Sequence, residues 1–130
     1  MKEIIRTDRA SQAIGPYSQA VRAGDFLFLS GQFPFDPVSG ELVAGGIESE
    51  TERVMENIEA ILAAAGLGLD SVVKTTIFLT DLASFGVVNG IYGRRFPVAP
   101  PARTTVQVAA LPRGAHVAIE VTAYDGPGAP

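Results

Sequence analysis

The run Phe26-Leu27-Phe28-Leu29 constrains the fold more than any other part of this sequence. Alternate side chains of a β-strand point to opposite faces of a sheet, so a strand here presents large apolar side chains to both faces. The chain offers six segments with strand character and only two with helical character. Two helices can cover one face of a six-stranded sheet but not both. We therefore expect an α+β protein with one mixed sheet, two helices on one face, and a homo-oligomer that covers the other face.

The strand segments are rich in β-branched and aromatic residues and are bounded by turn residues. They are Lys2–Arg6, Tyr17–Arg22, Phe26–Gln32, Ser71–Leu79, Ala102–Val108 and His116–Tyr124. The turn Ala23-Gly24-Asp25 joins the second and third segments into a hairpin. A loop rich in glycine and proline, Phe33–Gly46, follows.

The first helical segment follows that loop. Ser49 and Glu52 have the spacing of a capping box, with Ser49 as N-cap. Gly66 fits the position just beyond the end of such a helix. The apolar residues between them recur at spacings of three and four and share one face: Val54, Ile58, Ile61, Leu62 and Ala65.

The second helical segment, Asp81–Phe96, is weaker. Phe85, Val88, Tyr92 and Phe96 fall on one stripe. Three glycines interrupt the segment, and each disfavours a helix by up to ~1 kcal/mol relative to alanine. We expect this helix to need support from the sheet.

Length and charge bound the class of protein. The 130 residues predict a single domain over 1–130, with a frayed tail at 126–130. The formal net charge of −4 argues against nucleic acid or an anionic membrane as the main partner. The N-terminus lacks the apolar stretch of a secretory signal, and no apolar run approaches the ~20 residues that span a bilayer. We expect a cytoplasmic location.

Cysteine is absent, and His116 is the only histidine. Disulfides, thiolate catalysis and sulfur-ligated zinc are therefore excluded, and a histidine-based metal site is not expected. We expect His116 at the surface or at a strand end. The chain also has no phosphate-binding glycine motif. Any chemistry must come from arginine, carboxylates, hydroxyls, amides and the backbone.

Two charged residues interrupt the last two strand segments. Arg103 alternates with Thr105 and Gln107, and its planar guanidinium is suited to hold a carboxylate by two parallel hydrogen bonds. Glu120 lies in the middle of the last segment, where a carboxylate in a partly covered cleft can act as general acid or base. Arg103 equally fits a solvated charge on an open strand, and Glu120 also fits a solvent-facing carboxylate or an ion pair with Arg103. If the uncovered face is buried in an oligomer, a charged pair on it is costly unless it is functional.

Four further residues are weaker candidates. The Ser30 hydroxyl and the Gly31 amide can bind an oxygen or a water, but the residues alone favour a strand that ends at a turn. No histidine is placed to activate Ser30, so a serine-hydrolase triad is not expected. For Tyr17 a half-buried strand aromatic is the commoner case. Asn89 equally fits a solvated helix residue or one that bonds a loop.

Several segments together resemble the Rid (reactive-intermediate deaminase) family. The match keeps the family's order and spacing from about residue 4 to 125, and the first and third segments together are highly specific. The matching segments are Ile14–Val21, Leu29–Pro34, Pro101–Val106, Leu111-Pro112 and Ala118–Val121.

The resemblance implies a chorismate-mutase-like fold assembled as a homotrimer, with active sites in the clefts between subunits. It also implies hydrolysis of 2-iminobutanoate and 2-iminopropanoate to 2-keto acids and ammonia, without a cofactor. An imine carbon is already electrophilic, so orientation, a positioned water and proton transfer suffice for this reaction.

The resemblance further implies residue roles. Arg103 would bind the substrate carboxylate, Glu120 would position the attacking water and shuttle protons, and Ser30 would help hold substrate or water. Family members often carry cysteine at the position of Thr105, which is thought to contribute mainly its backbone. The remaining substrate-binding positions are Tyr17, Gly31 and Asn89.

Two other functions fit the same residues. The chain could be a trimeric module that binds a keto or amino acid without turning it over. A ribonuclease or translation inhibitor is a third interpretation, but the acidic balance and the lack of a basic, aromatic patch argue against it.

Overall fold

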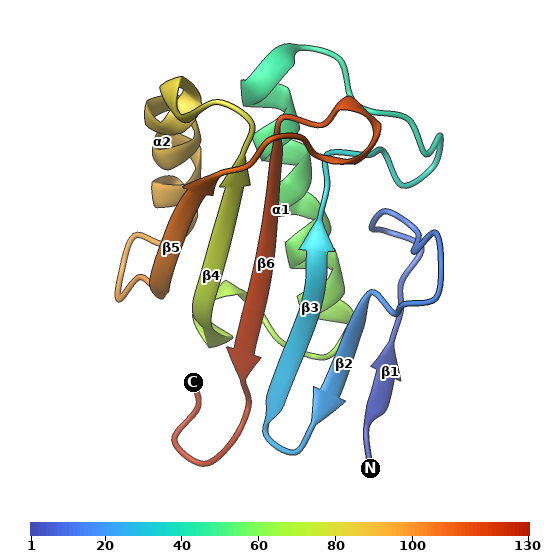
Figure 1. Ribbon diagram of the computed structural model, residues 1–130. Coiled ribbons are helices and arrows are strands. Elements are labelled where there is room, and N and C mark those ends of the chain that lie inside the picture. The colour runs from blue at the N-terminus through green and yellow to red at the C-terminus, as the bar shows by residue number, and fades with distance from the viewer.

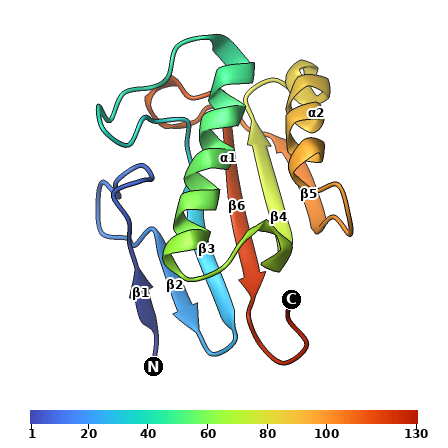
Figure 2. The ribbon, with the colours of Figure 1, turned by 180° about the vertical axis from the view of Figure 1, so that it is seen from behind.

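Six strands and two α-helices make up the computed structural model, which describes all 130 residues. They are β1 (Glu3–Ile5), β2 (Ala20–Ala23), β3 (Phe26–Gln32), α1 (Gly46–Ala64), β4 (Val72–Leu79), α2 (Phe85–Arg95), β5 (Ala102–Gln107) and β6 (Val117–Tyr124). The strands form one sheet in the order β1-β2-β3-β6-β4-β5 (Figure 1). Neighbouring strands are antiparallel except β4 and β5, which are parallel. Both helices lie on one face (Figure 2), as the sequence predicts.

The covered face of the sheet holds the core. Leu27, Ile77 and Ile119, from β3, β4 and β6, are fully buried, and α1 packs Ile58 and Leu62 against them. Burying an aliphatic side chain of this size contributes ~1.5–3 kcal/mol relative to leaving it in water. The alternate residues of these central strands therefore attach α1 to the sheet.

The second helix is held by the stripe that the sequence indicates. Val88 and Tyr92 are buried, and the Tyr92 ring packs against Phe96 at 4.8 Å between centroids. Phe85 is partly buried against the same core. This packing supports a helix that its three glycines disfavour. Neither helix has the length and apolar composition needed to cross a membrane.

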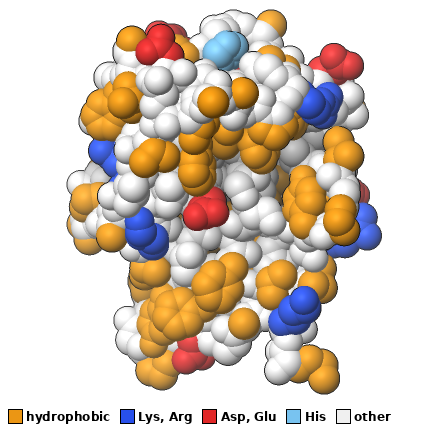
Figure 3. Space-filling view, viewed as in Figure 1, with side chains coloured by type: hydrophobic (Ala, Val, Ile, Leu, Met, Phe, Trp, Pro, Cys, Tyr) orange, Lys and Arg blue, Asp and Glu red, His pale blue; other side chains and the backbone are white.

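The other face of the sheet is open in the single chain. Phe26 and Phe28 are 40% and 48% exposed, and Val73 and Val106 are exposed as well. The Phe26 ring lies 6.2 Å from Phe28 and 5.2 Å from Tyr124. Figure 3 views this face and shows hydrophobic side chains gathered over it. The two apolar sets of β3 thus face α1 on one side and open surface on the other.

The start of α1 differs from the sequence prediction. Ser49 is not the N-cap, since Gly45 holds that position with φ +110° and no side-chain cap. Glycine reaches this conformation without strain, so the chain enters the helix at Gly46, ahead of Ser49. Glu52 does not reach back to the helix start, because it contacts Arg95 of α2. The capping box is therefore wrong.

The second strand also begins later than predicted. It starts at Ala20, so Tyr17 lies in the preceding loop and not in a strand. The buried Gln19 side chain accepts a hydrogen bond from the Thr7 amide and donates to the carbonyls of Thr7 and Ser11. These bonds hold the loop in place of sheet pairing.

Other boundaries shift by one to four residues. The second helix begins at Phe85 because Asp81 caps a short 3₁₀ turn, Leu82–Ser84, by accepting a hydrogen bond from the Ala83 amide. Gly66 has φ +78° and follows the end of α1, as predicted. The strand predicted at Lys2–Arg6 is shorter than expected. The predicted ends at Ser71, Val108 and His116 each lie one residue outside the observed strands.

His116 precedes β6, at a strand end as expected, but it has a buried partner. Glu50 of α1 is 2% exposed and accepts hydrogen bonds from the His116 amide at 2.8 Å and from its Nδ1 at 2.7 Å. A buried carboxylate needs such partners. The pair fixes the start of β6 against α1.

A network of ion pairs joins the two helices. Arg95 of α2 contacts Glu52 at 3.1 Å and Glu59 at 2.8 Å. The hydrogen bond from Arg95 holds the pKa of the Glu52 carboxyl below its ordinary value of 4.5. A lowered carboxyl pKa stabilises the folded chain above the unfolded pKa, and this stabilisation is lost as pH falls through the folded pKa.

We expect Glu52→Gln to lower the free energy of unfolding by about 0.5–1 kcal/mol at pH 7, since the pair is partly exposed. The gap to wild type should close as pH falls below 4.5. Denaturant titrations of both proteins, at several pH values and one protein concentration, measure this difference in the free energy of unfolding. Glu41→Gln, at an exposed position without an ion pair, is the control and should show no such pH dependence. A gap that persists at pH 2 would contradict the assignment.

Candidate functional site

Arg103 lies on β5 and points toward α2, on the covered side of the sheet. Its guanidinium carbon lies 5.3 Å from the centre of the Phe85 ring and 5.1 Å from that of Tyr92. Its Nη1 donates to Asn89 Oδ1 at 2.6 Å, which is its only side-chain hydrogen bond. No carboxylate contacts it, so its other N–H groups are free to bind an anion.

A cavity of about 440 Å³ opens beside this arginine. Its lining residues are Asn89, Tyr92, Gly93, Phe96, Pro100, Pro101 and Arg103. The Tyr92 hydroxyl lies 2.7 Å from the Thr75 hydroxyl, beneath the cavity wall. Burial raises the pKa of the Tyr92 phenol, which outweighs the opposing effect of that hydrogen bond. Tyr92 therefore faces Arg103 as a neutral ring.

Thr105 follows two residues after Arg103, on the same side of β5. Its hydroxyl is buried and has no hydrogen-bond partner. Leaving a buried polar group unpaired costs about 1–3 kcal/mol, so each such group in a folded chain needs an explanation. A ligand or a second chain that supplies the partner is one explanation.

Ser30 and Gly31 lie on β3 opposite Glu120 of β6. Leu29 pairs with Val121 and Gln32 with Ile119, so two residues of β3 face one residue of β6. Such bulges are frequent beside active sites, where they redirect the chain. The Ser30 hydroxyl donates to the Ser18 carbonyl at 2.6 Å, which fixes its orientation and leaves its oxygen able to accept.

Glu120 stands on the open face of the sheet. It is exposed, and it makes no hydrogen bond or ion pair through its side chain. Its neighbour across the strand pair is Thr76 of β4. The carboxylate is free to bind a water or to face another subunit.

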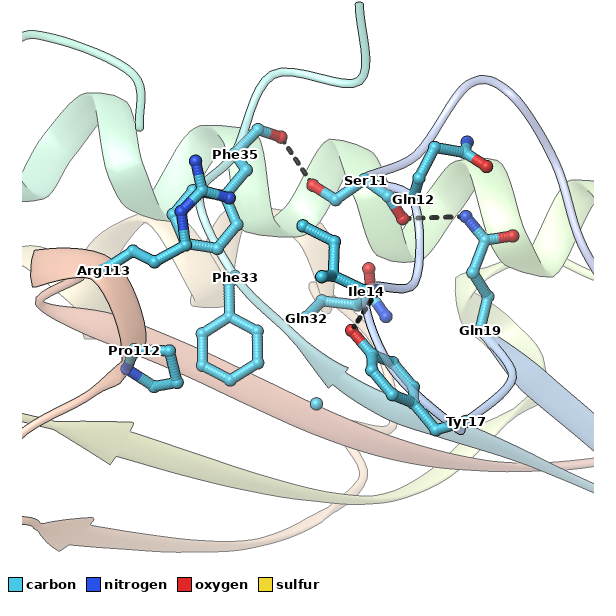
Figure 4. Close-up of a pocket in the computed structure, with 11 residues that line it drawn as sticks. Ser11, Gln12, Ile14, Tyr17, Gln19, Gln32, Phe33, Phe35, Pro112 and Arg113 are labelled. Carbon is cyan, nitrogen blue, oxygen red and sulfur yellow. Dashed lines mark hydrogen bonds between the residues drawn. The ribbon is translucent and has the colours of Figure 1, made fainter. Parts of the chain in front are cut away.

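A second cavity, of about 390 Å³, lies next to the bulge (Figure 4). It is lined by Ser11, Gln12, Ile14, Tyr17, Gln19, Gly31, Gln32, Phe33, Phe35, Pro112 and Arg113. Tyr17 and Phe33 present their rings on two sides of it (Figure 4). The Tyr17 hydroxyl accepts a hydrogen bond from the Ile14 amide at 3.3 Å. Tyr17 lies in the loop before β2, so it is not the strand aromatic of the alternative interpretation, and its side chain is 49% exposed.

The predicted site residues therefore form two groups. Arg103, Asn89 and Thr105 belong to β5 and α2, whereas Glu120, Ser30, Gly31 and Tyr17 belong to β6, β3 and the loop before β2.

The two charged residues of these groups lie on different sides of the sheet. Arg103 pairs with Thr75 and Glu120 with Thr76, and these neighbours on β4 point to opposite faces. A charged pair of Arg103 and Glu120 on the open face, or an ion pair between them in one chain, is thus wrong. The period of each strand is visible in sequence, but the register that sets its face on a neighbour is not.

Sequence reasoning missed the groups that hold Arg103. Phe85 and Tyr92 were interpreted only as core residues. Their spacing from Asn89, of four and three residues, places all three on one helix face and was the available signal. It also missed Arg113, which lies over the Phe35 ring at 4.4 Å. No group of three or more His, Cys, Asp or Glu side chains gathers to hold a metal.

Comparisons with known proteins agree with this architecture. Residues 7–125 match the family model described as Endoribonuclease L-PSP. The chain is 56% identical to Protein DfrA of Myxococcus xanthus, covering 94% of this chain and 95% of the relative. It is 48% identical to the mouse 2-iminobutanoate/2-iminopropanoate deaminase, covering 98% and 94%.

A solved structure shows the same fold. A Rid-family protein of Yersinia pestis superposes with a TM-score of 0.93 at 48% identity, covering 95% of this chain and 99% of that one. The family match, the relatives and the shared fold extend over almost the whole chain. The protein is therefore a member of the Rid family, whose sequence model is the one described as Endoribonuclease L-PSP.

Proposed function

We propose that this protein hydrolyses short 2-imino acids, such as 2-iminobutanoate and 2-iminopropanoate, to 2-keto acids and ammonia. The observation that carries the proposal is a partly buried arginine without a carboxylate partner, held by Asn89 beside an open cavity. An unpaired guanidinium of this kind suits a carboxylate ligand. The name of the mouse relative, an imine deaminase at 48% identity, supports the reaction.

We further propose that each site is shared between two subunits of a homotrimer. Arg103 and Glu120 lie on opposite sides of one sheet, so a substrate of four carbons cannot contact both within one chain. The exposed apolar face that carries Glu120 needs a cover. A neighbouring subunit that brings Arg103, Asn89 and Thr105 to Glu120, Ser30 and Gly31 meets both needs.

The reaction then follows from these groups. Arg103 binds the substrate carboxylate and orients the imine, while Glu120 accepts a proton from water as its oxygen attacks the imine carbon. That proton passes to the imine nitrogen, which gives a carbinolamine with a new C–O bond. Glu120 then takes the proton of the carbinolamine hydroxyl and passes it to the nitrogen, so that the C–N bond breaks and ammonia leaves as the C=O bond forms. Ser30 and the Gly31 amide hold the oxygen, and Tyr17 lines the cleft. No cofactor takes part, and the cytoplasm is the proposed location.

The first prediction from the proposed function concerns assembly. Light scattering should give a particle of about 41 kDa, three times the 13.6 kDa chain, at micromolar concentration. The uncovered aromatic face is the reason, since a monomer leaves it in water. A stable monomer would remove the basis for shared sites.

The second prediction separates binding from rate. Arg103→Ala should lower kcat/KM roughly 30-fold to several thousand-fold, because losing a bidentate charged contact costs ~2–5 kcal/mol. Arg103→Lys should recover little, since an ammonium lacks the planar fork. Glu120→Gln should lower kcat by ~10²–10⁴ and leave 2-ketobutyrate binding nearly intact.

Ammonia release from freshly generated imines and calorimetric binding of 2-ketobutyrate measure these effects, with EDTA-treated wild type as a control that should keep full activity. Binding without any turnover by the wild type would favour the non-catalytic binding module. Near-wild-type turnover by both variants would place the site elsewhere.

The third prediction tests the sharing of sites directly. Isolated mixed trimers of Arg103→Ala and Glu120→Gln chains should recover about a third of wild-type activity, since each mixed trimer holds one intact site of three. Co-expression with two different affinity tags isolates the mixed trimers, and unmixed variants are the controls. If both residues acted from the same chain, mixing would recover nothing.

A further inference from the structure

Several arginines of this protein contact carboxylates of the chain, and Arg103 does not. Arg22 contacts the carboxylates of Glu3 and Asp125, and Arg95 contacts those of Glu52 and Glu59. Their positive charge is compensated within the chain. Arg103 has no carboxylate within contact and is held only by neutral groups of α2.

Two aromatic rings and an amide restrain the Arg103 guanidinium. Its carbon lies within 5.3 Å of the ring centres of both Phe85 and Tyr92, inside the range of a cation–π contact. Such a contact uses the face of the guanidinium, whereas hydrogen bonds to a carboxylate use its edge. The rings can therefore fix the side chain while its edge and its charge stay available.

Both rings are themselves fixed. The Tyr92 hydroxyl is bonded to Thr75 at 2.7 Å, and Thr75 is the residue of β4 that pairs with Arg103. Phe85 follows the 3₁₀ turn Leu82–Ser84, whose Leu82 amide donates to Gln107 Oε1 of β5 at 2.9 Å. The strand that carries the arginine thus also positions the start of the helix that holds it.

We propose that Phe85 and Tyr92 are positioning residues that hold the Arg103 guanidinium ready for a carboxylate without compensating its charge. The inference rests on the proposed function. A guanidinium held in one orientation loses less rotamer freedom when the ligand binds, so the clamp increases affinity. It acts on binding of the carboxylate and not on proton transfer at Glu120.

Phe85→Leu tests this, because it keeps an apolar side chain of similar size and removes the ring. Kd for 2-ketobutyrate and KM should rise about three- to tenfold, while kcat changes less than about twofold. Phe85→Tyr restores a ring and should return both values to near wild type. Tyr92→Leu should act like Phe85→Leu if it folds, but the Phe85 variants suffice.

Val88→Ala is the matched control. Val88 is a fully buried α2 residue whose side chain carries no ring and no polar group. The change should lower the melting temperature and leave Kd unchanged. If Val88→Ala weakens 2-ketobutyrate binding as much as Phe85→Leu does, the rings act only through the fold and the proposal is overturned.

Nuclear magnetic resonance of arginine side chains reports the clamp without any ligand. In the free wild type, the Arg103 Nε–H signal, assigned with Arg103→Lys, should show a ring-current shift that Phe85→Leu removes and Val88→Ala keeps. If the wild type fails to bind 2-ketobutyrate but shows this shift, the proposed function fails and the clamp stands. A wild-type signal unchanged by Phe85→Leu, together with unchanged Kd, would overturn the clamp.

Discussion

The alternation of side chains along β4 is the constraint on which the rest of the molecule depends. Thr75 points to the covered face, where its hydroxyl is bonded to Tyr92, and Thr76 points to the open one. Because β5 and β6 pair with these two residues, Arg103 is directed toward α2 and Glu120 away from it. No rotamer change can bring them together across a sheet. The chain therefore holds the two residues apart, and the trimer proposed above would bring Arg103 of one subunit to Glu120 of another.

The open face links this separation to assembly. The same face that bears the Glu120 carboxylate also exposes Phe26 and Phe28. Covering these rings with a second subunit would remove water from around Glu120 as well, and electrostatic interactions are stronger where water is excluded. The apolar surface that favours association would thus also create the surroundings in which one carboxylate can direct a water molecule.

The sequence predicts the elements of this fold well because they follow from local patterns. The presence of only two helical segments predicts that one face of the sheet is uncovered within the chain, and the apolar stripe of α2 predicts which side of that helix is buried. The errors come from contacts between distant segments. Glu52 pairs with Arg95 of the other helix, so its spacing from Ser49 wrongly predicted a capping box. The hydrogen bonds of Gln19 to Thr7 and Ser11 hold the segment that contains Tyr17 as a loop, where a strand was predicted. The face of Arg103 depends on strand register, which one strand's pattern does not contain.

Hydrolysis of an imine, the reaction proposed above, requires few catalytic groups. The imine carbon is already electrophilic, so the remaining requirements are orientation and a route for protons. Orientation by Arg103 works only if its charge is not already compensated, and the neutral side chains of Asn89, Phe85 and Tyr92 meet that condition. A carboxylate in their place would fix the guanidinium equally well but would compete with every anionic ligand. The neutral partners of Arg103 therefore leave its charge available to a ligand, whereas the charges of Arg22 and Arg95 are compensated by carboxylates of the chain.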